Sequence, residues 1–262
     1  MLQGNVHGTN ALRFNAYLWA SSLCHRFMRL LLISNSTNSG ENYLQYALPA
    51  IADFTGNKSL KAVFIPFAAV TFSFDAYAQK LKEALGPLGL EIDPLHRYDD
   101  PAAALQLADC IIVGGGNTFQ LLNLLQVNAL TEVITRRVKQ GVPYIGWSAG
   151  SNIACPTICT TNDMPIVEPE SLKALNLVPF QINPHYLDAH PEGHAGETRE
   201  MRLLEYIEVN PDRYVVGLRE GTMLRIENMK ISLIGNRKAR IFRNGLQTME
   251  LGRKDDLGFL WE

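Results

Sequence analysis

Short runs of apolar residues alternate along the chain with longer segments that have the spacing of amphipathic helices. The apolar runs are continuous, which is typical of strands in a sheet that is covered on both faces. The longer segments repeat apolar residues every three or four positions and therefore predict helices. We expect strands at 30–33, 62–65, 110–113, 143–146, 178–182 and 214–218, and helices at 41–54, 75–85, 118–125 and 130–139.

This alternation predicts an α/β fold built on a doubly wound, mostly parallel sheet. After residue 214 the pattern changes to short strands separated by turn signals such as Gly235-Asn236. We expect these strands to form a small antiparallel C-terminal appendage to the sheet. The sequence contains no internal repeat and no convincing linker, so we expect residues 28–262 to form a single domain.

Residues 1–27 differ from the rest of the chain in composition and show no hydrophobic period. A targeting peptide is disfavoured because the segment has one early basic residue, Arg13, and no clear cleavage signal. The first apolar run begins only after Met28. We expect a leader that is disordered or derives from an upstream start codon, and a functional chain that starts at Met28.

Composition excludes several classes of partner. Lys and Arg number 24 against 26 Asp and Glu, so no basic excess is present to neutralise nucleic-acid phosphates. No apolar run reaches the roughly 18–20 residues that cross a bilayer. The four cysteines do not form a disulfide framework, and we expect Cys155 and Cys159 to be buried thiols. We therefore expect a cytoplasmic protein that binds neither nucleic acid nor membrane.

Polar residues gather directly after four of the predicted strands. In open α/β sheets, the carboxyl ends of the strands border the crevice in which ligands bind. A glycine-rich turn, a serine, a histidine and a carboxylate should all face this crevice, and they lie at 114–117, 147–150, 183–185 and 219–221.

The segment Gly-Trp-Ser-Ala-Gly at 146–150 fits the G-x-S-x-G nucleophile elbow, where serine stands on a strand-to-helix turn. Ser148 is therefore the candidate nucleophile, although a serine that caps a tight turn is the plain structural alternative. His185 is the best candidate base because it ends a predicted strand after an Asn-Pro turn. Asp163 and Glu220 are both plausible partners that orient the histidine, and each could instead cap a turn.

An oxyanion also needs backbone N–H donors. Ala149 supplies one because it follows the nucleophile, and the glycine turn at 114–116 could supply a second. The same turn gives only weak support for nucleotide binding, since Phe119 stands where the G-x-G-x-x-G motif needs its third glycine.

Three histidines, His185, His190 and His194, lie within ten residues, so a metal site must be weighed. His190 and His194 have the i, i+4 spacing of metal ligands on a helix, but Pro191 and Gly193 between them disfavour a helix. The segment also lacks the H-E-x-x-H motif. We expect no metal.

From Met28 onward the sequence resembles peptidase E, the α-aspartyl dipeptidase family of serine peptidases. The resemblance is looser after Gly221, and residues 1–27 have no counterpart in the family. The matching stretches are LLISNST (31–37), VFIPFA (63–68), IIVGGGNTFQLL (111–122), YIGWSAGSNIACPTICTTNDMPIV (144–167), QINPHY (181–186), PEGHAGETRE (191–200) and GLREG (217–221).

The resemblance implies a fold like that of class I glutamine amidotransferases, which is flavodoxin-like, with serine in place of cysteine on the elbow. It also implies an enzyme without metal or cofactor that hydrolyses dipeptides with an N-terminal aspartate. The implied site residues are Ser148 as nucleophile, His185 as base, Gly116 and Ala149 as oxyanion donors, and Asp163 or Glu220 as the third catalytic member. The strand-end position of Glu220 favours it slightly.

The resemblance further implies that Arg199 binds the aspartyl carboxylate of the substrate. A planar guanidinium can bind a carboxylate through two hydrogen bonds, and a neutral substrate would leave it unpaired. The residues alone favour a plainer role for Arg199, a surface ion pair with Glu197 or Glu200.

Other functions remain as alternatives. A glutamine amidotransferase-like enzyme would need a cysteine where Ser148 stands, and an α/β-hydrolase esterase shares the elbow motif. An inactive small-molecule binding protein could use the same scaffold. The expected partner is a small peptide substrate, and the sequence does not decide between a monomer and a homodimer.

Overall fold

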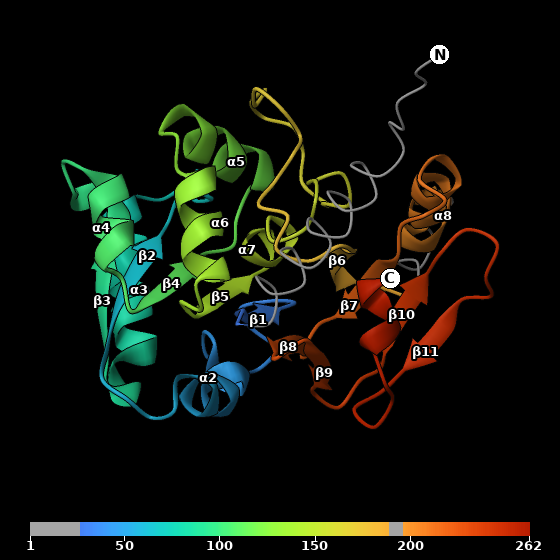
Figure 1. The fold of residues 1–262 in the computed structure, drawn as a ribbon, viewed down its shortest axis with the longest axis horizontal. Coiled ribbons are helices and arrows are strands. Elements are labelled where there is room, and N and C mark those ends of the chain that lie inside the picture. The colour runs from blue at the N-terminus through green and yellow to red at the C-terminus, as the bar shows by residue number, and fades with distance from the viewer. Residues whose placement is uncertain (1–26, 189–195) are drawn as a thin grey trace, which may run out of the picture.

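The computed structural model describes residues 27–188 and 196–262. Its larger sheet has seven strands in the order β3-β2-β4-β5-β1-β8-β9 (Figure 1). The first five strands of this order run parallel, and the last two continue the sheet antiparallel. The strands are β1 (Arg29–Ile33), β2 (Leu60–Ile65), β3 (Leu90–Pro94), β4 (Cys110–Val113), β5 (Tyr144–Trp147), β8 (Met223–Glu227) and β9 (Lys230–Ile234).

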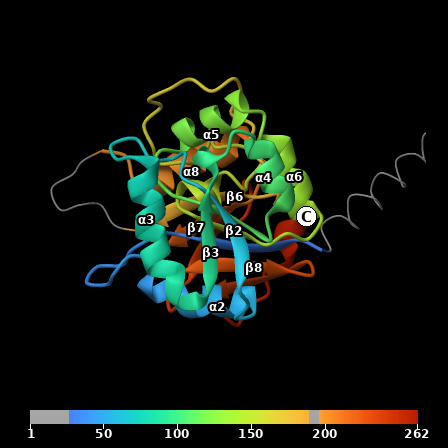
Figure 2. The same cartoon turned by 90° about the vertical axis from the view of Figure 1, so that its left-hand side faces the viewer.

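Helices cover both faces of this sheet because successive residues of its strands point to opposite sides (Figure 2). Along β1, Leu30 and Leu32 belong to one apolar core, whereas Leu31 and Ile33 belong to the other. The expected α/β fold with helices on both faces is confirmed. The first core is covered by α4 (Pro101–Leu107), α5 (Thr118–Val127), α6 (Thr131–Lys139) and α7 (Ala149–Asn152), and the second by α2 (Leu48–Thr55) and α3 (Phe74–Leu85).

A second sheet of four strands, in the order β11-β10-β7-β6, stands beside the first. Its strands β6 and β7 are parallel to each other, and the others are antiparallel. The sequence pattern places the runs at 178–182 and 214–218 in the main sheet, which is wrong, because a hydrophobic run reports burial but not its pairing partner. The elements are β6 (Gln181–Tyr186), β7 (Val215–Arg219), β10 (Ala239–Phe242), β11 (Met249–Leu251) and the covering helix α8 (Arg199–Val209).

Element boundaries follow the sequence pattern closely in the main sheet and less well elsewhere. The predicted helix at 41–54 does not extend before residue 45, because Leu44 adopts a left-handed φ of 57° that no α-helix accommodates. The α-helix itself, α2, begins at Leu48 after a 3₁₀ turn. The pattern did not predict β3, α4 or α8, and β3 is an edge strand with only partial burial. Short 3₁₀ turns complete the fold: η1 (Gln45–Ala47), η2 (Gly86–Leu88), η3 (Leu95–Arg97) and η4 (Gly258–Trp261).

The N-terminal segment and the cysteines can be compared with what the sequence predicts. Residues 1–26 of the expected leader lie outside the described residues, whereas Met28 is buried in the core. Cys110 and Cys155 are buried, but the prediction of a buried Cys159 is wrong, because the turn after buried Ile158 directs that residue to solvent. Within 27–188 and 196–262, no helix is long and apolar enough to span a membrane.

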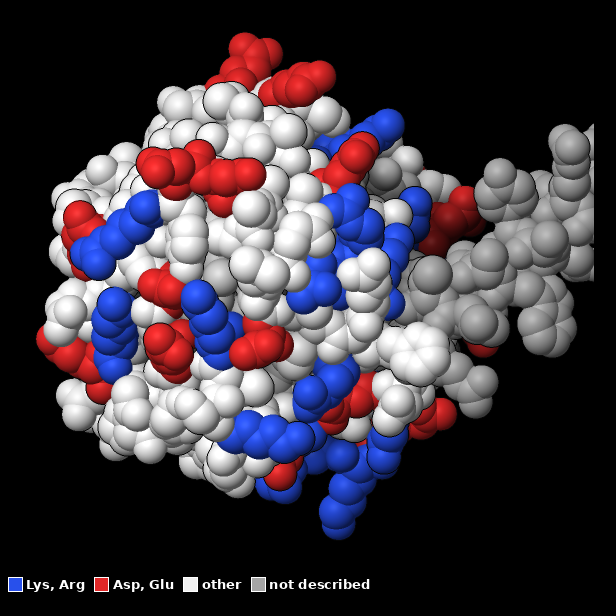
Figure 3. All heavy atoms as spheres, turned by 60° about the vertical axis from the view of Figure 1, so that its left-hand side comes forward, with Lys and Arg blue, Asp and Glu red and all other residues white. Residues whose placement is uncertain are grey.

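On the face shown in Figure 3, basic and acidic side chains are interspersed rather than gathered into one basic patch. Within the described residues, this face therefore has no continuous basic surface that could bind a phosphate backbone.

Candidate active site

Ser148 lies on the sharp turn between β5 and α7. Its φ of 52° and ψ of −113° are a conformation that non-glycine residues rarely adopt. The two elbow glycines permit this turn, since a Cβ on Gly146 would lie 2.4 Å from the carbonyl oxygen of Gly150. A Cβ on Gly150 would lie 2.2 Å from the carbonyl oxygen of Val113. The close backbone packing therefore requires glycine at both glycine positions of the elbow motif.

Ser148, His185 and Glu220 form one hydrogen-bonded chain. The Nε2 atom of His185 lies 3.0 Å from the Ser148 Oγ, and its Nδ1 atom lies 2.7 Å from the Glu220 Oε1. The His185 and Glu220 side chains are 37% and 40% exposed, so the chain of three is open to a substrate on one side. A nucleophile, a base and a carboxylate in this order are the geometry of a serine hydrolase triad.

The position of His185 on the chain differs from the prediction. Strand β6 does not end at residue 182 but continues to Tyr186, and its pairing with β7 shifts register between Asn183 and Tyr186. His185 has a φ of 52° in this irregular stretch. Such a bulge re-aims a side chain relative to the regular strand, and here the side chain reaches Ser148.

Two residues at the end of β1 hold the triad in place. Ser34 accepts a hydrogen bond from the His185 backbone N–H at 3.0 Å and donates one to the Leu218 carbonyl at 2.7 Å. Asn35 accepts one from the backbone N–H of Gly221, beside Glu220, at 2.9 Å. Neither residue is among those predicted from the sequence, although both directly follow an apolar run, as the predicted polar residues do.

Asp163 does not contact His185 in the described structure. Its carboxylate instead accepts hydrogen bonds from the Thr118 N–H at 2.7 Å, the Thr118 hydroxyl at 2.5 Å and the Thr161 hydroxyl at 3.0 Å. These contacts place it at the N-terminal end of α5, where a negative charge is favoured. The structure therefore pairs the histidine with Glu220, while Asp163 lines a small cavity beside Ser148.

The two backbone N–H groups expected to stabilise an oxyanion come from separate turns. Neither the Gly116 nor the Ala149 N–H has a hydrogen-bond acceptor within the described residues. Gly116 has a φ of 137°, and a Cβ there would lie 2.2 Å from the Ala68 carbonyl oxygen. A Cβ on Gly115 would lie 3.0 Å from the Ser148 Cβ, so this turn packs directly on the elbow.

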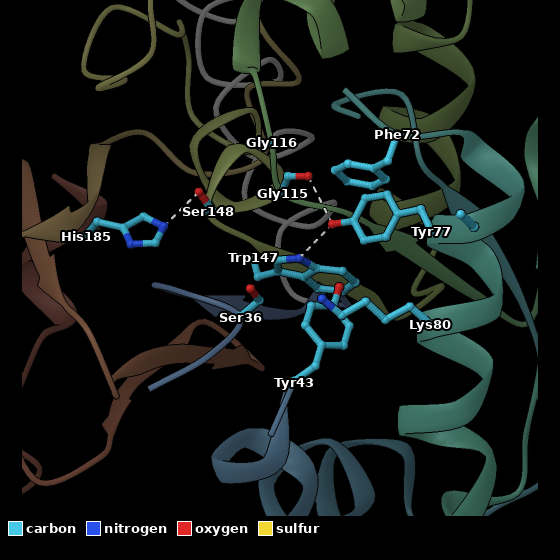
Figure 4. Close-up of a pocket in the computed structure, with 11 residues that line it drawn as sticks. Ser36, Tyr43, Phe72, Tyr77, Lys80, Gly115, Gly116, Trp147, Ser148 and His185 are labelled. Carbon is cyan, nitrogen blue, oxygen red and sulfur yellow. Dashed lines mark hydrogen bonds between the residues drawn. The ribbon is translucent and has the colours of Figure 1, made fainter. Parts of the chain in front are cut away.

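The orientation of the glycine turn is controlled by buried side chains. Tyr77 donates a hydrogen bond to the Gly115 carbonyl at 2.9 Å, and the Trp147 indole N–H donates one to the Tyr77 hydroxyl at 3.1 Å (Figure 4). Neither aromatic residue was singled out from the sequence, because a buried tyrosine gives no signal of what its hydroxyl contacts.

Two cavities meet at Ser148 and His185. The larger, of about 550 Å³, has aromatic walls and is shown in Figure 4. The smaller, of about 150 Å³, is bordered by Ala149, Asp163 and Arg199. The site therefore has a small polar side and a larger aromatic side.

Arg199 is the first residue of α8 and is half-buried. Its buried Nη1 has no hydrogen-bond partner in the described part of the chain. Burial, together with the positive charge of Arg202, lowers the pKa of Arg199, whereas the carboxylate of Asp163 opposes that shift. An unpaired, partly desolvated guanidinium favours an anionic ligand.

The plainer alternative for Arg199, an ion pair with a neighbouring glutamate, is not what the structure shows. Glu200 pairs with Arg240 at 2.7 Å, and Glu197 pairs with Arg202 at 3.7 Å. Both candidate glutamates are therefore engaged elsewhere, and the Arg199 guanidinium faces the small cavity.

Of the three histidines considered for a metal, His190 and His194 lie outside the described residues. Among the residues that are described, no group of three or more His, Cys, Asp or Glu side chains could hold a metal ion. His185 is engaged with Ser148 and Glu220.

Similar proteins are known. Peptidase E of Nostoc sp. is 51% identical over 234 residues, which cover 89% of this chain and 97% of that protein. Peptidase E of Salmonella typhimurium is 51% identical over 225 residues, which cover 86% of this chain and 97% of that protein.

Two solved structures share the fold. A putative peptidase E from Listeria monocytogenes EGD-e has a TM-score of 0.55 and 26% identity, covering 86% of this chain and 99% of its own. A peptidase from an acI-B1 actinobacterium has a TM-score of 0.61 and 18% identity, covering 89% of this chain and 97% of its own, and supports the fold alone.

The family model described as Peptidase family S51 matches residues 30–234. This match and the 51% identity to peptidase E confirm the predicted family and the predicted class of enzyme, a serine peptidase. The chain belongs to peptidase family S51.

Proposed function

We propose that this protein is a serine dipeptidase that hydrolyses dipeptides with an N-terminal aspartate. The observation that carries the proposal is the hydrogen-bonded chain from Ser148 through His185 to Glu220, beside Arg199, whose buried Nη1 has no partner among the described residues. The names of the similar peptidase E proteins are consistent with it.

The proposed reaction is acyl transfer through Ser148. His185 Nε2 accepts the hydroxyl proton as Ser148 Oγ attacks the aspartyl carbonyl carbon, and Glu220 stabilises the imidazolium that forms. The N–H groups of Gly116 and Ala149 donate to the tetrahedral oxyanion, a role worth about 10²–10³-fold in rate per donor. His185 then protonates the leaving amine, and it activates the water that hydrolyses the acyl-enzyme.

Specificity for aspartate is proposed to come from the small cavity. Its volume of about 150 Å³ suits a short side chain, and it is bordered by Arg199, whose buried Nη1 lacks a partner in the part of the chain that the structure describes. A substrate carboxylate would satisfy that donor with charge-assisted hydrogen bonds, while a neutral side chain would leave it unpaired.

We also propose two finer features that the family resemblance implies, a class I glutamine amidotransferase-like fold and catalysis without metal or cofactor. From the sequence pattern, we further propose a single domain over 28–262. Free, buried Cys110 and Cys155 are consistent with a cytoplasmic location, where thiols stay reduced.

Activity on a small panel of substrates tests the proposed function. We expect hydrolysis of Asp-Leu but not of Leu-Leu or a p-nitrophenyl ester, because only the first presents a carboxylate to Arg199. Ser148→Ala should lower kcat by roughly 10⁵-fold or more without changing the circular dichroism spectrum or Tm. Preferred cleavage of the ester would support an esterase, and substantial activity of the variant would reject Ser148 as nucleophile.

Glu220 and Asp163 can be distinguished by kcat. We expect Glu220→Gln to lower kcat by roughly 10²–10⁴-fold, because the histidine loses the carboxylate that orients it. Asp163→Asn should lower kcat less than about tenfold and act mainly on KM, because Asp163 lines the small cavity without contacting His185. The reverse order of the two kcat values, in folded variants, would assign the third member to Asp163.

Arg199→Ala should lower kcat/KM for Asp-Leu by about 100-fold or more, since truncating one partner of a desolvated charge pair is costly. The same substitution should change the slow hydrolysis of Asn-Leu far less. Arg202→Ala is the matched control on α8, because its side chain is 67% exposed and pairs only with Glu197 among the described residues. Equal losses on Asp-Leu and Asn-Leu would contradict a role for Arg199 in charge recognition.

A further inference from the structure

The larger of the two cavities has no role in the chemistry described above. Ser148 and His185 border both cavities, so a peptide bond placed between them directs its two halves to opposite sides. If the aspartyl half occupies the small cavity beside Arg199, as in the proposed function on which this inference rests, the leaving residue occupies the larger one.

The walls of the larger cavity are aromatic. Tyr43 and Trp147 meet edge to face with ring centroids 6.1 Å apart, and Phe72 and Tyr77 do so at 5.1 Å. Phe72 is 48% exposed, so an apolar face is available to a ligand (Figure 4). Burial of an apolar side chain against these rings is favourable by the hydrophobic effect.

One cation borders this aromatic cavity. Lys80 extends from α3 with its Nζ 4.4 Å from the centroid of the Tyr43 ring (Figure 4). It forms no ion pair with an acidic side chain in the described part of the protein. A dipeptide presents a free carboxylate on its leaving residue, which is the complementary charge.

We propose that the larger cavity binds the leaving residue of the substrate. Its rings contact a large apolar side chain, and Lys80 attracts the free carboxylate. Lys80 is exposed, so its contribution is moderate and screened by salt.

Paired substrates test this inference. The wild-type protein should cleave Asp-Leu with a kcat/KM about three- to tenfold above that of Asp-Leu amide, and Asp-Phe about tenfold or more above Asp-Gly. Lys80→Met should abolish the preference for the free carboxylate and leave the Asp-Phe to Asp-Gly ratio unchanged. Lys82→Met is the matched control on α3, because Lys82 does not line the cavity.

The outcomes separate this inference from the proposed function. The inference is overturned if the wild-type protein hydrolyses Asp-Leu and its amide with equal kcat/KM. It is also overturned if Lys80→Met lowers kcat/KM equally for both substrates. Either result leaves the dipeptidase function intact. If the wild-type protein cleaves no Asp-Xaa peptide, the proposed function fails and the inference fails with it.

A separate observation supports a second inference, about the oxyanion donor. The carbonyl that accepts the Tyr77 hydrogen bond and the N–H of Gly116 belong to the same peptide unit, between Gly115 and Gly116. In a planar trans peptide these two groups point in opposite directions, so holding the carbonyl also orients the N–H. Tyr77 is itself held by the Trp147 indole and is only 5% exposed.

We infer that Tyr77 is a positioning residue for the oxyanion site. Its hydroxyl fixes the plane of the glycine peptide and polarises it, which strengthens the Gly116 N–H as a donor. This hydrogen bond is part of the folded structure, so the peptide is oriented before the oxyanion forms.

Tyr77→Phe tests this role, since it removes the hydroxyl and retains the ring. We expect kcat to fall about tenfold with little change in KM, and binding of an aspartyl aldehyde, which forms a tetrahedral adduct on Ser148, to weaken by a similar factor. Binding of free aspartate, which forms no adduct, should not change. Tyr98→Phe is the control, because Tyr98 lines neither cavity.

A merely structural role would weaken aldehyde and aspartate binding together, and that result overturns the inference. If Tyr77→Phe does not fold, Trp147→Phe provides the second test, because it removes the hydrogen bond that holds the Tyr77 hydroxyl. It should weaken aldehyde binding more than aspartate binding, and equal effects on the two ligands would again overturn the inference.

Discussion

The close backbone contact around the Ser148 elbow is the constraint on which the site depends. The serine keeps its strained φ and ψ because α7 lies against β4 and β5 with glycine at 146 and 150, where no Cβ fits. Backbone strain of this kind persists only when the surrounding packing over-determines it. Here the packing is the buried centre of the seven-stranded sheet, so the stability of the fold maintains the position of Ser148 at the border of the two cavities.

The proposed triad is assembled across two sheets. Ser148 and the glycine turn follow strands of the larger sheet, whereas His185 and Glu220 come from β6 and the end of β7 in the smaller one. Ser34 joins them, because its hydroxyl bonds to the His185 backbone and to β7 at once while it continues β1. The relative placement of the sheets thus decides whether the proposed nucleophile and the proposed base meet.

The acidic side chains close to Arg199 all form contacts with other residues. Arg240 binds Glu200, and Arg202 binds Glu197, so the acidic neighbours of Arg199 along the chain are occupied. Asp163 is satisfied by Thr118 and Thr161. The buried Nη1 donor of Arg199 is left without a partner among the described residues, in a protein whose overall charge is close to neutral.

By itself, the sequence determined strands β1, β2, β4 and β5 of the main sheet, helices α3, α5 and α6, and the elbow at Ser148, because hydrophobic period and turn glycines report local conformation and burial. It also identified His185 and two candidate acids. Only the tertiary structure paired β6 with β7 in a second sheet, turned His185 through a bulge and chose Glu220 over Asp163 as its hydrogen-bond partner. Those features depend on which distant segments pair, and a pattern along one chain carries no information about the partner across the sheet.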